Sequence, residues 1–103
     1  MSNNAKPLPG LPRDLDARIR AAAAALRAAG AREVYLFGSA ARAQATETSD
    51  IDLAVSGLPP EGFFRAMGDA REILRRSLDL IDLDEDTPFA RYLKQRGEMI
   101  LVL

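Results

Sequence analysis

The chain is expected to fold as one small α/β domain, in which helices pack on a mixed central sheet of about four strands. Three observations predict this class. A length of 103 residues suits a single compact domain. The apolar pattern switches repeatedly between helical spacing and short runs typical of strands. With 48% hydrophobic and 28% charged residues, the composition is that of a globular protein rather than a disordered segment.

The N-terminal part predicts a leader, a helix, a strand and a short second helix. Residues 1–12 carry three prolines, two asparagines and a glycine, so we expect a flexible leader before a domain at 13–103. From Arg13 apolar residues recur at helical spacing, and Gly30 is suited to cap that helix. The run EVYLF at 33–37 predicts a buried strand, after which a short alanine-rich helix opens at Ser39.

The C-terminal part predicts three more strands separated by two helices. Residues 50–55 alternate with period two, and the sequence GLPP that follows forces a turn. Apolar residues at helical spacing then predict a helix over 63–74, and a third strand follows at 78–83. Thr87 is an expected N-cap, with Pro88 at the first position of a helix that runs to Gly97. The last buried strand is expected at 99–103.

Composition narrows the possible chemistry. The net charge of -1 gives no positive field for extended nucleic-acid binding, although a small nucleotide is still possible. The chain has no cysteine and no histidine, so any metal must bind to oxygen ligands. No apolar run reaches the length of a membrane span, and the start of the chain lacks the apolar region of a signal peptide. We therefore expect a cytoplasmic protein.

Two short motifs could form a phosphate and metal site. Gly38 and Ser39 end a strand and open a helix, an arrangement whose free N–H groups can face an anion. Alone, this dipeptide is more typical of an ordinary turn with Ser39 as N-cap. Twelve residues after Gly38, however, Asp50 and Asp52 place two carboxylates on one strand face, where they repel unless a cation or solvent compensates them. An oxygen-only site of this kind suits Mg²⁺.

The segments FGSAAR at 37–42 and SDIDLAV at 49–55 closely resemble the signature of the polymerase β-like nucleotidyltransferases. The resemblance is strongest to the minimal nucleotidyltransferases of the MntA antitoxin type and extends over the domain from about Arg13 onward. It implies that fold, a Mg²⁺-dependent transfer of AMP or another nucleotide from ATP or a related triphosphate, and two groups of site residues. The nucleotide-binding residues would be Gly38, Ser39 and Arg42, and the catalytic and metal-binding residues Asp50, Asp52 and Asp79.

Asp79 enters as the third carboxylate because the segment LDLI at 78–81 resembles the family's neighbouring strand. Alternation places Asp82 on the opposite face, which makes it the weaker candidate unless the strand register shifts by one residue. The family usually has glycine after the motif arginine, whereas Ala43 stands here, and alanine adopts a left-handed backbone only with difficulty. Arg42 could face the triphosphate or pair with Glu47.

The resemblance also implies an acceptor and a partner. Antitoxins of this type act with an all-helical HEPN-domain toxin, and active members transfer AMP to a tyrosine hydroxyl of that partner. Two alternatives remain open: a noncatalytic antitoxin that only covers its partner, and transfer to a small hydroxylated molecule such as an antibiotic.

Other charged and aromatic groups have simpler interpretations. The arginines near the end of the helix at 63–74 should complement its dipole and face solvent, and four helical aromatics should pack in the core rather than stack on a base. These residues are Arg71, Arg75 and Arg76, and Phe63, Phe64, Phe89 and Tyr92.

Overall fold

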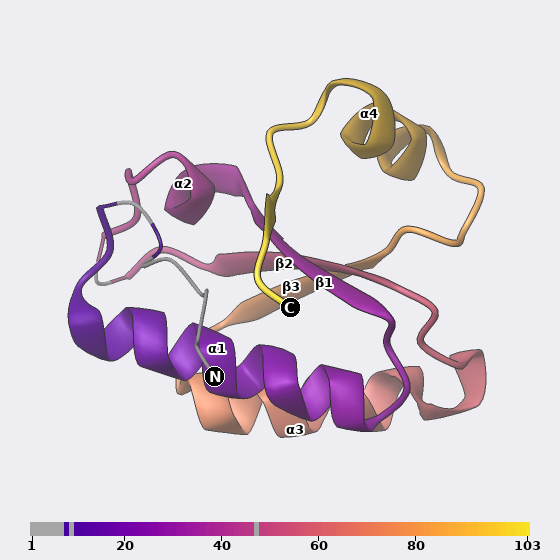
Figure 1. The fold of residues 1–103 in the computed structure, drawn as a ribbon, viewed down its shortest axis with the longest axis horizontal. Coiled ribbons are helices and arrows are strands. Elements are labelled where there is room, and N and C mark those ends of the chain that lie inside the picture. Colours follow the sequence, from indigo (N-terminus) through magenta and orange to yellow (C-terminus); the bar gives the residue numbers. More distant parts are fainter. Residues whose placement is uncertain (1–7, 9, 47) are drawn as a thin grey trace, which may run out of the picture.

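The computed structural model describes residues 8, 10–46 and 48–103 and contains the expected alternation of helices and strands (Figure 1). The elements, in chain order, are α1 (Arg13–Ala28), β1 (Glu33–Phe37), α2 (Gly38–Ala41), β2 (Ile51–Ser56), the 3₁₀ turn η1 (Pro60–Gly62), α3 (Phe63–Leu74), β3 (Leu78–Asp82), α4 (Pro88–Arg96) and β4 (Ile100–Leu101). The predicted α/β class is confirmed. No helix among the described residues is both long and apolar enough to cross a membrane.

The strands form one four-stranded mixed sheet in the order β3-β2-β1-β4. β1 is antiparallel to both β2 and β4, whereas β2 and β3 run parallel. The parallel pair is joined by a crossover through α3, as parallel neighbours require. Its register places Asp52 directly beside Asp79.

One face of the sheet is covered by α1 and α3, which lie side by side beneath it (Figure 1). Every second residue of β2 points into this larger core, so Ile51, Leu53 and Val55 are fully buried. Ile19 and Leu26 of α1 fill the same core from the helix side. The helical spacing of the apolar residues therefore predicted the buried face of α1 correctly.

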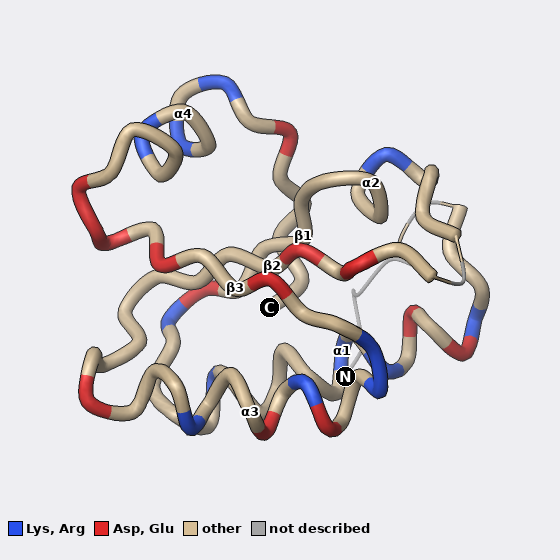
Figure 2. The backbone as a smooth tube through the Cα atoms, turned by 180° about the vertical axis from the view of Figure 1, so that it is seen from behind, with Lys and Arg blue, Asp and Glu red and all other residues tan. Residues whose placement is uncertain are grey.

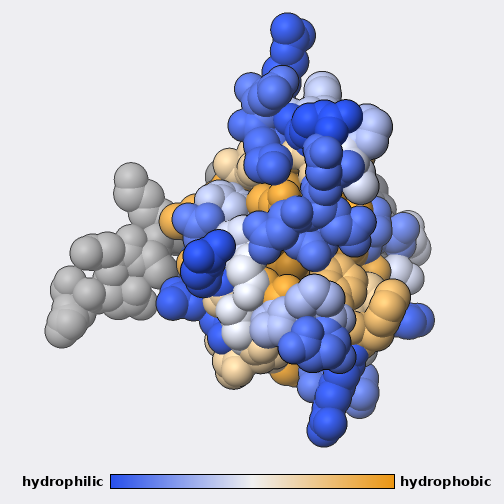
Figure 3. Space-filling model, turned by 90° about the vertical axis from the view of Figure 1, so that its right-hand side faces the viewer, coloured by the Kyte–Doolittle hydropathy of each residue, from blue (hydrophilic) through white to orange (hydrophobic). Residues whose placement is uncertain are grey.

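The opposite face of the sheet carries α4 and only a small second core. Phe37, Ala54, Leu83 and Leu93 form its buried part. This smaller cover leaves the face open where β1 ends and where β2 and β3 begin, and Asp52 is half-buried there. Figure 3, which views the side of the molecule with the β2–α3 and β3–α4 connections, shows apolar surface between hydrophilic groups.

The last strand is shorter than predicted. The sequence placed it at 99–103, but β4 contains only Ile100 and Leu101, and Leu101 is 57% exposed. β4 is an edge strand that pairs with β1 alone, so one side has no neighbour to extend the ladder. The backbone nevertheless continues to bond β1, because the Val102 N–H donates to the Val34 carbonyl at 2.8 Å.

Packing also extends N-terminally of α1. Most of the expected leader, residues 1–7 and 9, lies outside the described residues. Leu8 is only 4% exposed within the larger core, and its N–H donates to Asp16 Oδ2 at 2.8 Å. Leu11 packs against the same core. The folded unit therefore includes side chains that precede Arg13.

Candidate active site

Gly38 forms a sharp turn against the first strand of the parallel pair. Its φ of 75° lies in the left-handed region, which glycine adopts without strain. A Cβ atom built at this position would lie 2.1 Å from Asp52 Oδ2. Position 38 therefore requires glycine for two reasons: the backbone is left-handed there, and the Asp52 carboxylate occupies the space that a Cβ would need.

Ser39 does not cap the helix that it was expected to open. α2 begins one residue earlier, at Gly38, and the N-cap position belongs to Phe37, with no side-chain cap bond. The Ser39 carbonyl instead accepts the Gln44 N–H at 2.8 Å, which folds the following loop back on α2. The Ser39 hydroxyl is therefore not used to satisfy the end of the helix.

Ala43 adopts the backbone conformation that its side chain disfavours. Its φ is 59°, where the family's usual glycine is free of strain and an alanine costs roughly 1–2 kcal/mol. Its N–H donates to the Ala40 carbonyl at 3.2 Å, so the loop keeps the tight turn despite the substitution. Gly10 packs closely here, since a Cβ on Gly10 would lie 2.3 Å from the Ala43 Cβ.

Three carboxylates face the open side of the sheet near Gly38. Asp52 and Asp79 are paired across β2 and β3, and Asp50 precedes Asp52 by two residues. Figure 2 shows the acidic segments of the strands gathered in the middle of the molecule. Partial burial raises the pKa of the Asp52 carboxyl, and the negative charges of Asp79 and then Asp50 raise it further. Asp79 and Asp50 therefore both lie close enough to Asp52 to act on its charge.

Arg42 supplies the opposing charge. It lowers the pKa of Asp52, although less than burial and the two carboxylates raise it. Its Nε lies 3.5 Å from Gln44 Oε1, and the side chain is exposed. Glu47, its other expected partner, lies outside the described residues.

The carboxylates are neighbours but do not form a closed ligand set. Within the described part of the chain, no three Asp, Glu, His or Cys side chains are grouped closely enough to hold a metal ion. Neither Asp50, Asp52 nor Asp79 takes part in an ion pair among the described residues. The charges of these three aspartates can therefore be compensated by solvent, or by a cation that takes its other ligands from water or substrate.

Asp82 lies apart from this group. It pairs in register with Val55, whose side chain is buried in the larger core under α1 and α3. Its Oδ1 accepts the Asp84 N–H at 2.9 Å and so helps to form the turn after β3. The predicted strand register is therefore correct, and Asp79 is the carboxylate beside Asp52.

Arg76 holds the loop that leads to Asp50, a role that the sequence did not predict. It was expected to face solvent, but its Nη2 donates to the carbonyls of Thr46 and Ser49. The Ile51 N–H also donates to the Ser77 carbonyl at 2.9 Å. These long-range bonds fasten the start of β2 to the end of α3, and no local pattern indicates them.

The aromatic residues of α4 are not core residues, contrary to the expectation. Phe89 is 46% and Tyr92 55% exposed, and Phe64 on α3 is 77% exposed. Phe89 and Tyr92 stack on each other, and Phe89 also contacts Phe37 at the end of β1. The core-facing positions of α4 are instead occupied by Ala90 and Leu93, because this short helix buries only a narrow face.

Carboxylates on two parallel strands that face a glycine turn at the end of a third strand are the arrangement expected of a nucleotidyltransferase. Comparison with protein families agrees at this level. Residues 26–102 match the family described as Polymerase beta, Nucleotidyltransferase. This match covers most of the chain, so the chain belongs to that family.

Two solved structures have folds similar to that of this chain. One, described as the crystal structure of a toxin-antitoxin with AMP-PNP, matches with a TM-score of 0.63 and 22% identity, covering 78% of this chain and 68% of the other. Another, a tyrosine-to-alanine mutant of the toxin-antitoxin MntA-HpeT, matches with a TM-score of 0.55 and 28% identity, covering 75% of this chain and 66% of the other. No curated protein matches the chain. The structures confirm the resemblance to MntA-type minimal nucleotidyltransferases.

Proposed function

We propose that the chain is a Mg²⁺-dependent nucleotidyltransferase that transfers AMP, or another nucleoside monophosphate, from a nucleoside triphosphate to a hydroxyl acceptor. The observation that carries the proposal is the pairing of Asp52 with Asp79 across β2 and β3, with Asp52 Oδ2 directly against Gly38. Membership of the polymerase β nucleotidyltransferase family supports the reaction class. Asp50, Asp52 and Asp79 are the proposed catalytic residues.

The phosphate-binding part is proposed at the turn after β1. Because Gly38 has no side chain, the start of α2 lies directly against Asp52, and a phosphate bound by the free N–H groups of this turn would lie close to the carboxylates. The Ser39 hydroxyl, which does not cap α2, can donate to a phosphate oxygen. Arg42 adds a positive charge near Asp52 and can offset the charge of a triphosphate. We propose that these three residues together bind the β- and γ-phosphates.

The donor chemistry fits a magnesium site. The three carboxylates supply only hard oxygen ligands. Partial burial raises the pKa of Asp52 first, and the negative charges of Asp79 and Asp50, which a divalent cation would offset, raise it further. Mg²⁺ usually takes one or two carboxylates and completes its shell with water and substrate phosphates, so a closed protein cage is not required. When bound by Asp50, Asp52 and Asp79, it would neutralise phosphate charge and lower the pKa of the acceptor hydroxyl.

The residues of the chain then have defined tasks. The acceptor oxygen forms a bond to the α-phosphorus while the bond from that phosphorus to the α,β-bridging oxygen breaks, and pyrophosphate leaves. The acceptor proton passes to Asp79, because the chain has no histidine to take it. Arg42 and the Gly38–Ser39 turn retain the leaving pyrophosphate oxygens. All of this takes place on the open face of the sheet, away from α1 and α3.

We further propose that the acceptor is a tyrosine of a HEPN-type toxin and that the chain is the antitoxin. Support comes from the similarity to two toxin-antitoxin structures, one of them described with AMP-PNP.

A label-transfer assay tests the proposal. The chain is incubated with Mg²⁺, the product of the neighbouring gene as the candidate toxin, and ATP labelled at either the α- or the γ-phosphate. We expect label from the α position alone on a tyrosine of the toxin, and none with the Asp50→Asn/Asp52→Asn double variant. Transfer of the γ label, or full transfer by the double variant, would contradict the proposal.

The second candidate is a noncatalytic antitoxin that neutralises its partner by forming a complex. It is favoured by the absence of a closed metal-ligand group among the described side chains. This reading predicts that wild type and the double variant bind and inhibit the toxin equally and that no label is transferred. Transfer of the α label excludes it as the sole function.

A further inference from the structure

Phe89 and Tyr92 form an exposed aromatic pair on α4 that could line one side of a ligand site. Phe89 and Tyr92 stack with ring centroids 6.4 Å apart and an interplanar angle of 16°. Neither ring is needed to hold α4 on the sheet, because the fully buried Ala90 and the buried Leu93 make that contact. Phe89 packs on Phe37 with part of its surface, and both Phe89 and Tyr92 keep about half of their surface exposed.

The pair is fixed to the glycine turn. The ring centroid of Phe89 lies 5.9 Å from that of Phe37, which is buried and immediately precedes Gly38 in the chain. Consecutive Cα atoms are about 3.8 Å apart, so the aromatic pair begins within one residue of the proposed phosphate turn.

A pocket lies between these elements. It has a volume of about 240 Å³, and its lining includes Gly38 and Arg42 together with Phe89 and Tyr92. Sites that bury a drug-sized molecule usually have about 300–1,000 Å³. The smaller pocket therefore suits one planar ring system rather than a whole nucleotide.

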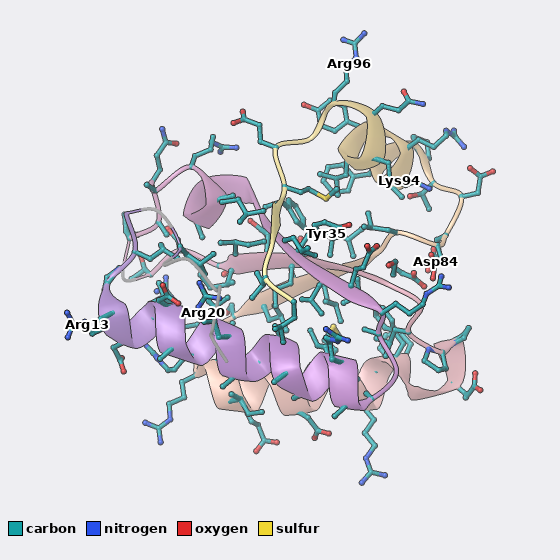
Figure 4. The ribbon with its side chains drawn as sticks, in the orientation of Figure 1. Arg13, Arg20, Tyr35, Asp84, Lys94 and Arg96 are labelled. Atoms are coloured by element: carbon teal, nitrogen blue, oxygen red, sulfur yellow. The ribbon has the colours of Figure 1, made fainter. Side chains whose placement is uncertain are left out.

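Charged groups of both signs also line the pocket, since Arg42 and Glu98 are among its lining residues. Arg96 also lines the pocket, but in Figure 4 its side chain points outward from α4, away from the sheet. Phe89 and Tyr92 are exposed aromatic rings in the same lining, and they can stack on a planar group. Every nucleobase has a π-face, so stacking tolerates different bases.

We propose that Phe89 and Tyr92 form a stacking platform for the base of the nucleoside triphosphate whose phosphates bind at Gly38 and Ser39. The proposal rests on the proposed function, because the same triphosphate is the substrate. It adds a nucleobase subsite on α4 and implies that ATP and GTP bind with affinities within a few-fold of each other.

The test compares a ligand that has a base with one that lacks it. The affinities of Mg²⁺-ATP and Mg²⁺-tripolyphosphate are measured by calorimetry for wild type, Tyr92→Ala, Tyr92→Phe and Phe64→Ala. Phe64 is the matched control, because it is an exposed helical aromatic that does not line the pocket. Thermal unfolding of each variant verifies its fold, and Tyr92 is exposed enough for truncation to be tolerated.

We expect Tyr92→Ala to weaken ATP binding at least about five-fold, since one stacked base commonly contributes that much or more. Its affinity for tripolyphosphate should not change. Tyr92→Phe keeps the ring and should bind ATP like wild type, as should Phe64→Ala. Fluorescence gives a second readout, because the chain has two tyrosines and no tryptophan. Quenching by ATP should persist in Tyr35→Phe and be lost in Tyr92→Phe.

The failures are distinguishable. If wild type binds tripolyphosphate and ATP equally well, or if Tyr92→Ala leaves ATP affinity unchanged, the platform is refuted while the proposed function stands. An equal loss for both ligands in Tyr92→Ala also refutes it, because the effect then does not involve the base. If wild type binds neither ligand in the presence of Mg²⁺, both the proposed function and the platform fail.

Discussion

Replacing Asp52 by asparagine should make the isolated protein more stable. In the absence of divalent ions, Asp52 lies beside the like charge of Asp79 and close to Asp50. Cross-strand side-chain pairs contribute roughly 0.2–1 kcal/mol, and like charges directly opposite are destabilising. Solvent screens a half-buried carboxylate, so we expect Asp52→Asn to raise the free energy of unfolding by about 0.5 kcal/mol. For a domain of this size, that is a rise in melting temperature of about 2–4 °C.

The pH dependence of this gain follows from the raised pKa of Asp52. A carboxyl whose folded pKa lies above its unfolded value binds its proton more tightly in the folded state. Its effect on stability is therefore absent below the unfolded pKa, near 3.8, and the destabilisation develops as the pH rises through the folded pKa. The advantage of the asparagine variant should be complete at pH 7 and vanish near pH 3.

Urea unfolding followed by circular dichroism, at pH 7 and pH 3 in the presence of a chelator, measures the effect. Added Mg²⁺ should reverse the order at pH 7, because it stabilises only the protein that retains the intact carboxylates. A loss of stability in Asp52→Asn at pH 7 without divalent ions, or an equal gain at both pH values, would refute the reasoning.

Three further substitutions test the backbone and the loop around the site. Ala43→Gly should raise the free energy of unfolding in urea by about 0.5–1 kcal/mol, because glycine removes the strain of the left-handed backbone. Gly38→Ala should lower it by at least about 2 kcal/mol and abolish ATP binding in calorimetry, since the added Cβ meets the Asp52 carboxylate. Arg76→Ala should slow α-label transfer about 10- to 100-fold by releasing the loop before Asp50, and should cost about 1–2 kcal/mol in urea unfolding.

Matched glycine positions provide the controls for these variants. Gly68 lies within α3 and has open space for a Cβ, so Gly68→Ala should stabilise the protein by roughly 0.5–1 kcal/mol. Both Gly68→Ala and Ala43→Gly are thus expected to stabilise the protein, although one adds a methyl group and the other removes one. Gly62→Ala also meets no atom and should leave ATP binding intact. Destabilisation by Ala43→Gly, normal ATP binding by Gly38→Ala, or wild-type transfer by Arg76→Ala would contradict the corresponding explanation.

The sequence was sufficient to predict the order of elements and the faces of the central strands. Period-two alternation placed Asp79 and Asp82 on opposite faces of their strand, and the register between β2 and β3, which pairs Asp52 with Asp79 and Val55 with Asp82, agrees with it. Thr87 was also predicted correctly as an N-cap, since its Oγ1 accepts the Ala90 N–H at 3.1 Å. These features depend on local periodicity and capping, which a single sequence records directly.

Features that depend on distant contacts could not be predicted. The bonds from Arg76 to the loop before Asp50 span about thirty residues, so its position at the end of α3 indicated only a solvent-facing charge. Helical spacing places Phe89 and Tyr92 on one side of α4, but it does not tell which side faces the sheet. Ala43 kept the turn of a glycine because the surrounding bonds determine its backbone, against its own preference.

The central claim is that the carboxylate beside Asp52 completes the catalytic group. The most direct test is the rate of α-label transfer from ATP to the proposed toxin partner, measured for Asp79→Asn and for its matched control Asp82→Asn. These two aspartates lie three residues apart on β3 and face opposite sides of the sheet. The account predicts that Asp79→Asn loses at least about 100-fold in rate, whereas Asp82→Asn transfers within a few-fold of wild type. Normal transfer by Asp79→Asn, together with loss in Asp82→Asn, would contradict it.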